Sequence, residues 1–325
     1  MGLTVAVTGP TGEIGISAVT ALERDPAVDR VIGMARSPFD PAEHGWTKTT
    51  YRQGDILDRA AVDDLVRDAD VVVHLAFLIM GSREESAQIN LRGTRAVFEA
   101  TVAAPRPRRL VYTSSVAAYG YHEDNPVPLT EDVPPRGSDE HYYSRQKADC
   151  EAALAEITDG TDLEVYVLRP CIVAGPAAPA LAELPWSHLP DIWRNASKSV
   201  PVLKPVVPDP GAALQLVHHD DVASAIATAA TTDAPAGAYN IAGDGVVTLS
   251  EVVTALGGRP VRVPGVLGKV AAEVVSRTPF VPPVMEWIHI IRASVVMDTD
   301  KAKTQLGWRP AHTTAETLES LAADR

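Results

Sequence analysis

The residues with the clearest chemical potential are a tyrosine and a lysine four positions apart, in Tyr143-Ser144-Arg145-Gln146-Lys147. On a helix, positions i and i+4 share one face, so the phenol and the ammonium can lie side by side. A tyrosine with a pKa of about 10 is a poor base at neutral pH, but a neighbouring cation favours its phenolate. Tyr143 is therefore a candidate general base or acid for a hydroxyl or carbonyl group.

The neighbouring Tyr142 is the weaker candidate, because its i+4 partner is Gln146 and it points off this face. The helix is expected over Tyr142–Glu156, with Ser138 or Asp139 as its cap. The alternative interpretation, a core tyrosine beside a surface lysine, is weakened by a second motif near the N-terminus.

That motif is a glycine-rich turn, which reads Thr-Gly-Pro-Thr-Gly-Glu-Ile-Gly over residues 8–15. Gly9 permits a tight turn, Gly12 lets the backbone approach a pyrophosphate, and Gly15 lets helix and strand pack closely. The N–H groups of the following helix and its dipole favour an anion. Any strand-to-helix connection can use glycine, but the first such connection is where a dinucleotide turn belongs.

The elements that must position these residues follow a regular alternation of β-rich runs and helix-period segments. The expected strands are Leu3–Thr8, Val31–Ala35, Thr49–Arg52, Val71–Leu75, Leu110–Ser114 and Glu164–Leu168. The expected helices are Gly12–Glu23, Arg59–Arg67, Glu85–Ala103 and Tyr142–Glu156. This alternation predicts an α/β fold with a doubly wound parallel (Rossmann) sheet.

After Arg169-Pro170 prolines multiply and the alternation breaks down, so residues 1–170 are expected to form the dinucleotide-binding domain. Residues 171–325 are expected to form mainly a smaller C-terminal substrate-binding lobe. The chain should return to the main sheet near 212–242, where strands are expected at Leu214–Val217 and Ala238–Ile241. Three apolar segments are equally compatible with core, dimer helix or substrate contact: 77–80, 184–186 and 263–275.

Further motifs extend the pattern over nearly the whole chain. They are Gly54-Asp55-Ile56, His74-Leu75-Ala76-Phe77, Asn90-Leu91-Arg92-Gly93-Thr94, Arg169-Pro170 with Val173 and Gly175-Pro176, Val217-His218-His219-Asp220-Asp221-Val222, and Leu306-Gly307-Trp308. With the Gly-x-x-Gly-x-x-Gly turn, this set resembles the extended short-chain dehydrogenases/reductases, the family of NAD-dependent epimerases and dehydratases. The resemblance implies an enzyme that uses a nicotinamide dinucleotide.

The resemblance also implies roles for individual residues. Ser115 would bind the substrate hydroxyl, Tyr143 would transfer the proton, and Lys147 would also bind the nicotinamide ribose. Ser114 competes with Ser115, but strand alternation turns it away. The residues expected at the cofactor are Gly9, Thr11, Gly12, Glu13, Ile14, Gly15, Arg36, Asp55, Ile56, Leu75, Ala76, Phe77, Asn90, Thr113, Tyr143, Lys147, Pro170 and Val173.

The end of the second strand bears on which cofactor binds. NAD-selective sites carry an acid there for the ribose hydroxyls, whereas a nearby arginine accommodates a 2′-phosphate. This chain has Ala35 at the expected place of the acid, followed by Arg36. The sequence therefore favours NADP over NAD, with a solvated strand-end arginine as the alternative.

Departures from the family's pattern bear on the reaction. Ser114-Ser115-Val116-Ala117 lacks the acidic pair typical of sugar-nucleotide dehydratases, which disfavours dehydration. Cys171 and Leu214 stand where sugar-nucleotide epimerases carry diphosphate-binding Asn and Arg. We therefore expect a ketone reductase or secondary-alcohol dehydrogenase acting on a small, relatively apolar substrate. An NAD-dependent sugar-nucleotide epimerase is the alternative, and a non-catalytic dinucleotide sensor is a further one.

Composition narrows the partners. A formal charge of -13 disfavours nucleic acid and anionic membranes. Two cysteines, Cys150 and Cys171, suit a reducing cytoplasm. His218-His219-Asp220-Asp221 is expected to be a strand end and a helix capped by Asp221, not a metal site. By resemblance, a homodimer is expected to pair the helices around 85–103 and 142–156.

Overall fold

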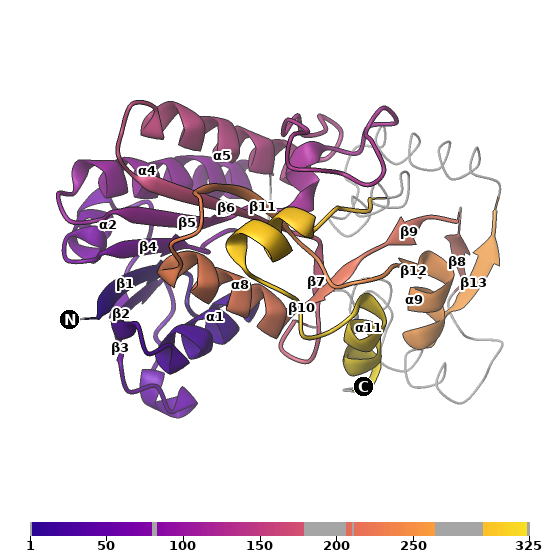
Figure 1. Ribbon diagram of the computed structural model, residues 1–325, viewed down its shortest axis with the longest axis horizontal. Coiled ribbons are helices and arrows are strands. Elements are labelled where there is room, and N and C mark those ends of the chain that lie inside the picture. The colour runs from indigo at the N-terminus through magenta and orange to yellow at the C-terminus, as the bar shows by residue number, and fades with distance from the viewer. Residues whose placement is uncertain (1, 80–82, 179–205, 210, 264–294, 324–325) are drawn as a thin grey trace.

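The computed structural model describes residues 2–79, 83–178, 206–209, 211–263 and 295–323 (Figure 1). Its strands are β1 (Leu3–Thr8), β2 (Val28–Ala35), β3 (Thr49–Gln53), β4 (Val71–His74), β5 (Arg109–Thr113), β6 (Glu164–Pro170), β7 (Ile172–Ala174), β8 (Val206–Asp209), β9 (Ala213–Leu214), β10 (Leu216–His218), β11 (Gly237–Ile241), β12 (Val247–Thr248) and β13 (Arg259–Arg262). Its helices are α1 (Glu13–Arg24), α2 (Arg59–Val66), α3 (Arg83–Ala87), α4 (Thr94–Ala103), α5 (Tyr142–Thr158), α8 (His219–Thr231), α9 (Leu249–Ala255) and α11 (Thr314–Ala323), with the short helical turns η1 (Pro41–His44), η2 (Gln88–Gly93), η3 (Val116–Tyr119) and η6 (Ala302–Leu306).

Seven parallel strands form the main sheet in the order β11-β6-β5-β4-β1-β2-β3. The chain proceeds outward in one direction from β1 to β3 and in the other from β4 to β6. The strand order therefore reverses between β1 and β4, where ligands bind in doubly wound sheets, outside the carboxyl ends of the strands. The predicted doubly wound fold is confirmed.

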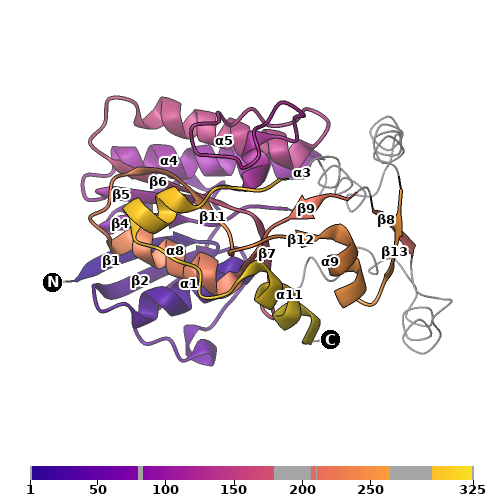
Figure 2. The same cartoon turned by 45° about the vertical axis from the view of Figure 1, so that its right-hand side comes forward.

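Helices cover both faces of this sheet (Figures 1 and 2). Alternate residues of one strand serve the two layers, because successive side chains point to opposite faces. Val5 and Val7 pack in the core with α1 and α8, whereas Ala6 packs in the core with α2 and α4. Burial on both faces explains why the strands read as apolar runs.

The expected helix over Glu85–Ala103 is interrupted. The structure divides this stretch into α3, a π-helical turn over Gln88–Gly93, and α4. Gly93 lies so close to Ile56 that a Cβ there would stand 2.6 Å from the isoleucine Cδ1. Single π turns occur frequently at functional sites, and this one carries Asn90.

The C-terminal part returns to the main sheet through β11, which pairs with β6. The run at 214–217 instead divides between β9 and β10, which pair with β12 and β7 outside the main sheet. Residues 184–186 and 264–275, two of the apolar segments noted in the sequence, lie outside the described residues, as does Met80. Within the described part of the chain, no helix combines the length and apolar character needed to cross a bilayer.

The predicted cap of α5 was wrong. α5 begins after His141, whose side chain makes no capping hydrogen bond. Ser138 Oγ instead accepts a hydrogen bond from the backbone N–H of Tyr121 at 2.8 Å, and Asp139 pairs with Arg145 at 3.1 Å. Both side chains thus fix the loop before the helix.

The predicted cap of α8 was also wrong. The ring of His218 accepts the hydrogen bond from the N–H of Asp220 at 3.3 Å. Asp221 lies in the first turn, where its carboxylate accepts hydrogen bonds from the backbone of Ala311 at 2.7 Å and of His312 at 3.0 Å. Asp221 therefore ties the C-terminal segment to α8.

Candidate functional site

The glycine turn between β1 and α1 contains two glycines that the protein itself requires. Gly9 has a φ of +73°, and a Cβ there would stand 2.8 Å from the backbone nitrogen of Ala76. A Cβ on Gly15 would stand 2.1 Å from the carbonyl oxygen of Gly9. Only glycine fits at either place without moving backbone.

Gly12 is different, because the protein leaves room beside it. A Cβ there would meet nothing closer than the Gly9 carbonyl oxygen at 3.6 Å. Gly12 is the residue before α1 and provides no side-chain cap to the helix. Gly12 and Glu13 are exposed, and Thr11 and Ile14 are half-buried. An open, uncapped helix N-terminus with space for a close approach fits a pyrophosphate.

The loop after β4 is held from beneath by a buried histidine. His74 Nδ1 lies 2.6 Å from Thr8 Oγ1, and its Nε2 lies 2.9 Å from Thr94 Oγ1. The N–H of Ala76 also donates to Thr8 Oγ1 at 3.4 Å. Burial, helped by the charge of Lys147, lowers the pKa of His74 to about 3, so the ring is neutral and acts as a structural link.

Asn90 supports the same loop and offers no free amide group. Its Oδ1 accepts from the N–H of Leu78 at 2.7 Å. Its Nδ2 donates to the carbonyl of Leu78 at 2.9 Å and to Gln146 Oε1 at 2.8 Å. The residue is fully buried. Its relation to a cofactor is therefore indirect, through the loop that carries Leu75, Ala76 and Phe77.

The structure brings Ser115, Tyr143, Lys147 and Thr113 together beyond the carboxyl end of β5. Lys147 Nζ donates to the carbonyl oxygen of Thr113 at 3.0 Å and lies 3.6 Å above the centre of the Phe77 ring. The Tyr143 ring meets Phe77 edge-on, with ring centres 5.6 Å apart. Thr113 Oγ1 is buried without a hydrogen-bond partner among the described residues, which suits a ligand group at this point.

The electrostatics of the two α5 residues follow from their burial. Burial lowers the pKa of Lys147 to about 8, against the opposing charges of Cys150 and Glu151. Burial also raises the pKa of the Tyr143 phenol, and its hydrogen bond with Ser115 lowers it in part. The lysine is thus charged and the phenol protonated at neutral pH in the protein alone, so the tyrosine is ready to donate a proton.

The depressed pKa of Lys147 predicts a pH-dependent contribution to stability. Between about pH 8 and 10.5 the unfolded chain holds more protons at this lysine than the folded chain, so its contribution to unfolding free energy rises with pH. The unfolding free energy of the natural protein minus that of a Lys147→Met variant should therefore become more positive as pH rises across this window. Urea titrations of both proteins at several pH values measure it, and a flat difference would count against the buried charge.

Ser114 and Tyr142, the competing candidates, have partners elsewhere. Ser114 Oγ donates to Glu151 Oε1 at 2.5 Å. The Tyr142 hydroxyl donates to the backbone of Ile79 at 3.0 Å. Ser115 Oγ accepts from the N–H of Ala117 at 3.2 Å.

Glu151 is a residue that sequence reasoning missed. Its carboxylate forms a buried ion pair with Arg169, at 2.6 Å to Nη2. The available signal was its spacing, since Glu151 lies eight residues after Tyr143 and therefore on the same helical face.

At the adenine end, Arg36 is exposed beyond β2. Its loop is fixed by backbone contacts: Tyr51 donates to the carbonyl oxygens of Ala35 and Ser37, and Gln53 Nε2 donates to that of Arg36 at 2.8 Å. The Arg36 guanidinium makes no hydrogen bond or ion pair with the described residues and is free to meet a ligand.

The other predicted adenine-end residues follow β3. Asp55 is half-buried and accepts from the N–H of Leu57 at 2.9 Å, whereas Ile56 is buried in the core layer with α2 and α4. Pro170 ends β6, and Val173 lies half-buried in β7.

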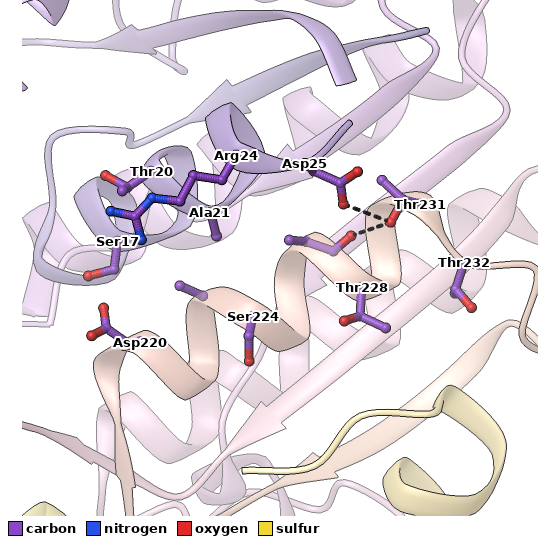
Figure 3. Close-up of a pocket in the computed structure, with 12 residues that line it drawn as sticks. Ser17, Thr20, Ala21, Arg24, Asp25, Asp220, Ser224, Thr228, Thr231 and Thr232 are labelled. Carbon is purple, nitrogen blue, oxygen red and sulfur yellow. Dashed lines mark hydrogen bonds between the residues drawn. The ribbon is translucent and has the colours of Figure 1, made fainter. Parts of the chain in front are cut away.

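A separate groove of about 680 Å³ runs between α1 and α8 (Figure 3). Hydroxyl groups and one exposed arginine, Arg24, line it, and Thr231 Oγ1 donates to Asp25 at 3.3 Å. None of the residues predicted at the cofactor or catalytic site lines this groove.

His218, His219 and Asp220 place potential ligand atoms within 4.8 Å of one another. His219 Nδ1 lies 2.8 Å from Ser17 Oγ, and His218 Nδ1 caps α8, so both nitrogens already have partners.

Comparisons with known proteins agree with this arrangement. A family model described as the NAD dependent epimerase/dehydratase family matches residues 5–242. An uncharacterized protein of Mycobacterium tuberculosis is 27% identical over 324 residues, covering 97% of this chain and 82% of the relative.

Two solved structures show the same fold. A short-chain dehydrogenase/reductase superfamily protein of Agrobacterium tumefaciens with bound NAD has a TM-score of 0.73 at 19% identity, with 99% and 97% of the two chains covered. UDP-N-acetylglucosamine 4-epimerase of Bacillus cereus has a TM-score of 0.70 at 20% identity, with 99% and 98% covered. The family match over residues 5–242 shows that the chain belongs to the NAD-dependent epimerase/dehydratase family, and the two structures show that it shares their fold.

Proposed function

We propose that this protein is a nicotinamide-dependent enzyme that interconverts a secondary alcohol and a ketone at Tyr143. The observation that carries the proposal is the convergence of Ser115, Tyr143 and Lys147 beside Thr113, at the carboxyl end of β5. A bound nicotinamide supplies the hydride acceptor or donor.

The protein's own residues handle the proton and the substrate oxygen. In oxidation, Tyr143 accepts the hydroxyl proton as the hydride leaves the carbinol carbon, and in reduction it returns that proton to the carbonyl oxygen. Ser115 orients the same oxygen by a hydrogen bond. Lys147 stabilises the phenolate through its charge and is anchored for this role by the Thr113 carbonyl.

Within this chemistry we place a redox-neutral epimerase first. The support comes from the family match and from a fold shared with an enzyme described as UDP-N-acetylglucosamine 4-epimerase. The net reductase favoured by the sequence has no such support and becomes the second candidate. An epimerase would use Tyr143 twice, first to accept and then to return the same proton.

One structural observation favours the second candidate. Cys171 and Leu214 are only 7% and 4% exposed, and both belong to apolar clusters. Neither can donate a charged hydrogen bond to a diphosphate at those places. A smaller, less polar carbonyl substrate would need no such donor.

The nucleotide that the purified protein retains separates the two candidates. We would denature the protein, identify any released nucleotide by chromatography, and titrate a second sample with NADH and NADPH. About one equivalent of retained NAD supports an epimerase that keeps its cofactor, whereas an empty site that exchanges reduced cofactor supports a reductase. Absence of binding in both measurements would refute the proposed function.

The cofactor preference makes a separate prediction. For the second candidate, the reductase, we propose NADP as the preferred form, because Arg36 is exposed and free to pair with a 2′-phosphate. Arg36→Ala should weaken NADPH binding about tenfold and leave NADH binding within about twofold, because a charged hydrogen bond contributes about 1.5 kcal/mol or more. Fluorescence titration of both cofactors measures the ratio. Equal losses of affinity for the two cofactors would instead indicate that Arg36 contacts the adenine ring. Unchanged affinity for both would indicate a solvated side chain.

A further inference from the structure

The catalytic helix carries a third charged residue on its active face. Tyr143, Lys147 and Glu151 are spaced four residues apart on α5, so they follow one line along the helix. The Glu151 side chain is only 6% exposed, at the place where α5 crosses the ends of β5 and β6. A carboxylate so deeply buried requires partners that fix its place.

Three donors supply those partners. Arg169 at the end of β6 contacts both carboxylate oxygens, from Nε at 3.1 Å and from Nη2 at 2.6 Å. Ser114 at the end of β5 donates to Oε1 at 2.5 Å. The arginine side chain is 5% exposed and lies 4.6 Å above the centre of the Tyr119 ring. The bidentate contact between Arg169 and the Glu151 carboxylate restrains α5 both along and across the strands.

The strand ends held in this way are those that carry the site. Ser114 lies between Thr113 and Ser115, and Lys147 donates to the Thr113 carbonyl one helical turn before Glu151. Tyr119 continues the contact by donating to Asn240 Oδ1 at 2.7 Å on β11. The network therefore joins α5 to three neighbouring strands at their carboxyl ends.

A buried ion pair of this kind contributes little to stability compared with an apolar pair of the same size. We therefore attribute its role to the orientation of α5 and to the charge that it places near Lys147. We propose that Glu151 and Arg169 are positioning residues that hold the Tyr143–Lys147 face of α5 against the Thr113–Ser115 turn and set the charge environment of Lys147. This inference rests on the proposed function, because it takes the roles of Tyr143 and Lys147 from it.

The pKa of Lys147 offers a readout of this charge environment that a change in packing alone would not move. The titratable groups around Lys147 are Tyr143, Cys150 and Glu151 on α5, Tyr112 on β5 and His74 on β4. Burial lowers the pKa of Lys147, whereas the charge of Glu151 raises it. Removal of that charge should lower this pKa further.

The test compares Glu151→Gln with Glu164→Gln in the full-length protein. Glu164 forms a similar pair with Arg109 at 2.6 Å, but at the opposite end of β6 and half exposed. The titration of Lys147 would be followed by NMR of protein labelled at lysine Cε, with Lys147→Met used to assign the signal. We expect the Lys147 midpoint to fall by about one pH unit in Glu151→Gln and to stay unchanged in Glu164→Gln. An unchanged midpoint in folded Glu151→Gln would overturn the proposal.

A second variant tests the positioning role and serves also if Glu151→Gln does not fold. Ser114→Ala keeps the ion pair but removes the hydrogen bond from the turn to Glu151, so NADH affinity should fall several-fold while the Lys147 midpoint stays in place. Unchanged NADH affinity would overturn the positioning role. Neither the Lys147 midpoint nor NADH affinity depends on turnover. A failure of this inference can therefore be told apart from a failure of the catalytic role proposed for Tyr143.

Discussion

Replacement of Tyr143 by phenylalanine is expected to lower turnover about a thousandfold, the size of effect typical of a lost general acid or base. The ring would still meet Phe77 edge-on, so the fold and the cofactor affinity should be retained. The assay uses the secondary alcohol or nucleotide sugar that the natural protein converts. It follows hydride transfer for a reductase, or inversion of configuration at the substrate carbon for an epimerase.

Tyr142→Phe provides the matched control, because it removes the adjacent hydroxyl, which donates to the backbone of Ile79. That variant should keep turnover within about threefold of the natural protein. If Tyr143→Phe retained normal turnover with normal cofactor binding, the catalytic assignment would be wrong.

The second large effect is expected at the glycine turn, where two Gly→Ala variants should fail in different ways. Gly15→Ala places a methyl group 2.1 Å from the Gly9 carbonyl oxygen, so it should destabilise the fold by about 2 kcal/mol or more. Gly12→Ala has space within the protein and precedes α1, so it should lose at most about 1 kcal/mol.

Cofactor binding should reverse that order of severity. In Gly12→Ala the new methyl group faces the proposed pyrophosphate site, so NADH affinity should fall at least about tenfold although the protein stays folded. Thermal unfolding and NADH titration of the two variants test the pair. Normal NADH affinity in Gly12→Ala would move the dinucleotide away from this turn.

The main sheet was predictable because buried parallel strands leave a direct trace in the sequence. Val71–His74 is buried on both faces and therefore reads as an uninterrupted apolar run. The start of α5 at Tyr142 was also predicted, because the Tyr143–Lys147 spacing fixes the helical period. Such features depend on residues close together in the chain.

The caps and the buried ion pair were not predictable, because each depends on a partner far away in the sequence. Aspartate is a residue type that commonly caps helices, yet Asp221 accepts a hydrogen bond from the backbone of Ala311, 90 residues later. Glu151 meets Ser114 and Arg169, which come from two other strands. Local propensity carries no information about such tertiary partners.

The reaction class was the hardest inference for a related reason. The residues proposed for proton transfer lie on α5 and after β5, whereas the sequence assigned substrate binding to the C-terminal lobe. Cys171 and Leu214 pointed to an apolar substrate, but the family that matches the chain is described by epimerases and dehydratases.

A crystal structure of the protein with bound NADH tests the central claim most directly. We predict that the pyrophosphate lies over Gly12 at the start of α1, and that Lys147 Nζ lies within about 3.2 Å of a nicotinamide ribose hydroxyl, beside Tyr143. A nucleotide bound elsewhere, such as in the groove between α1 and α8, with Tyr143 and Lys147 left without contact to it, would contradict the assignment of this site.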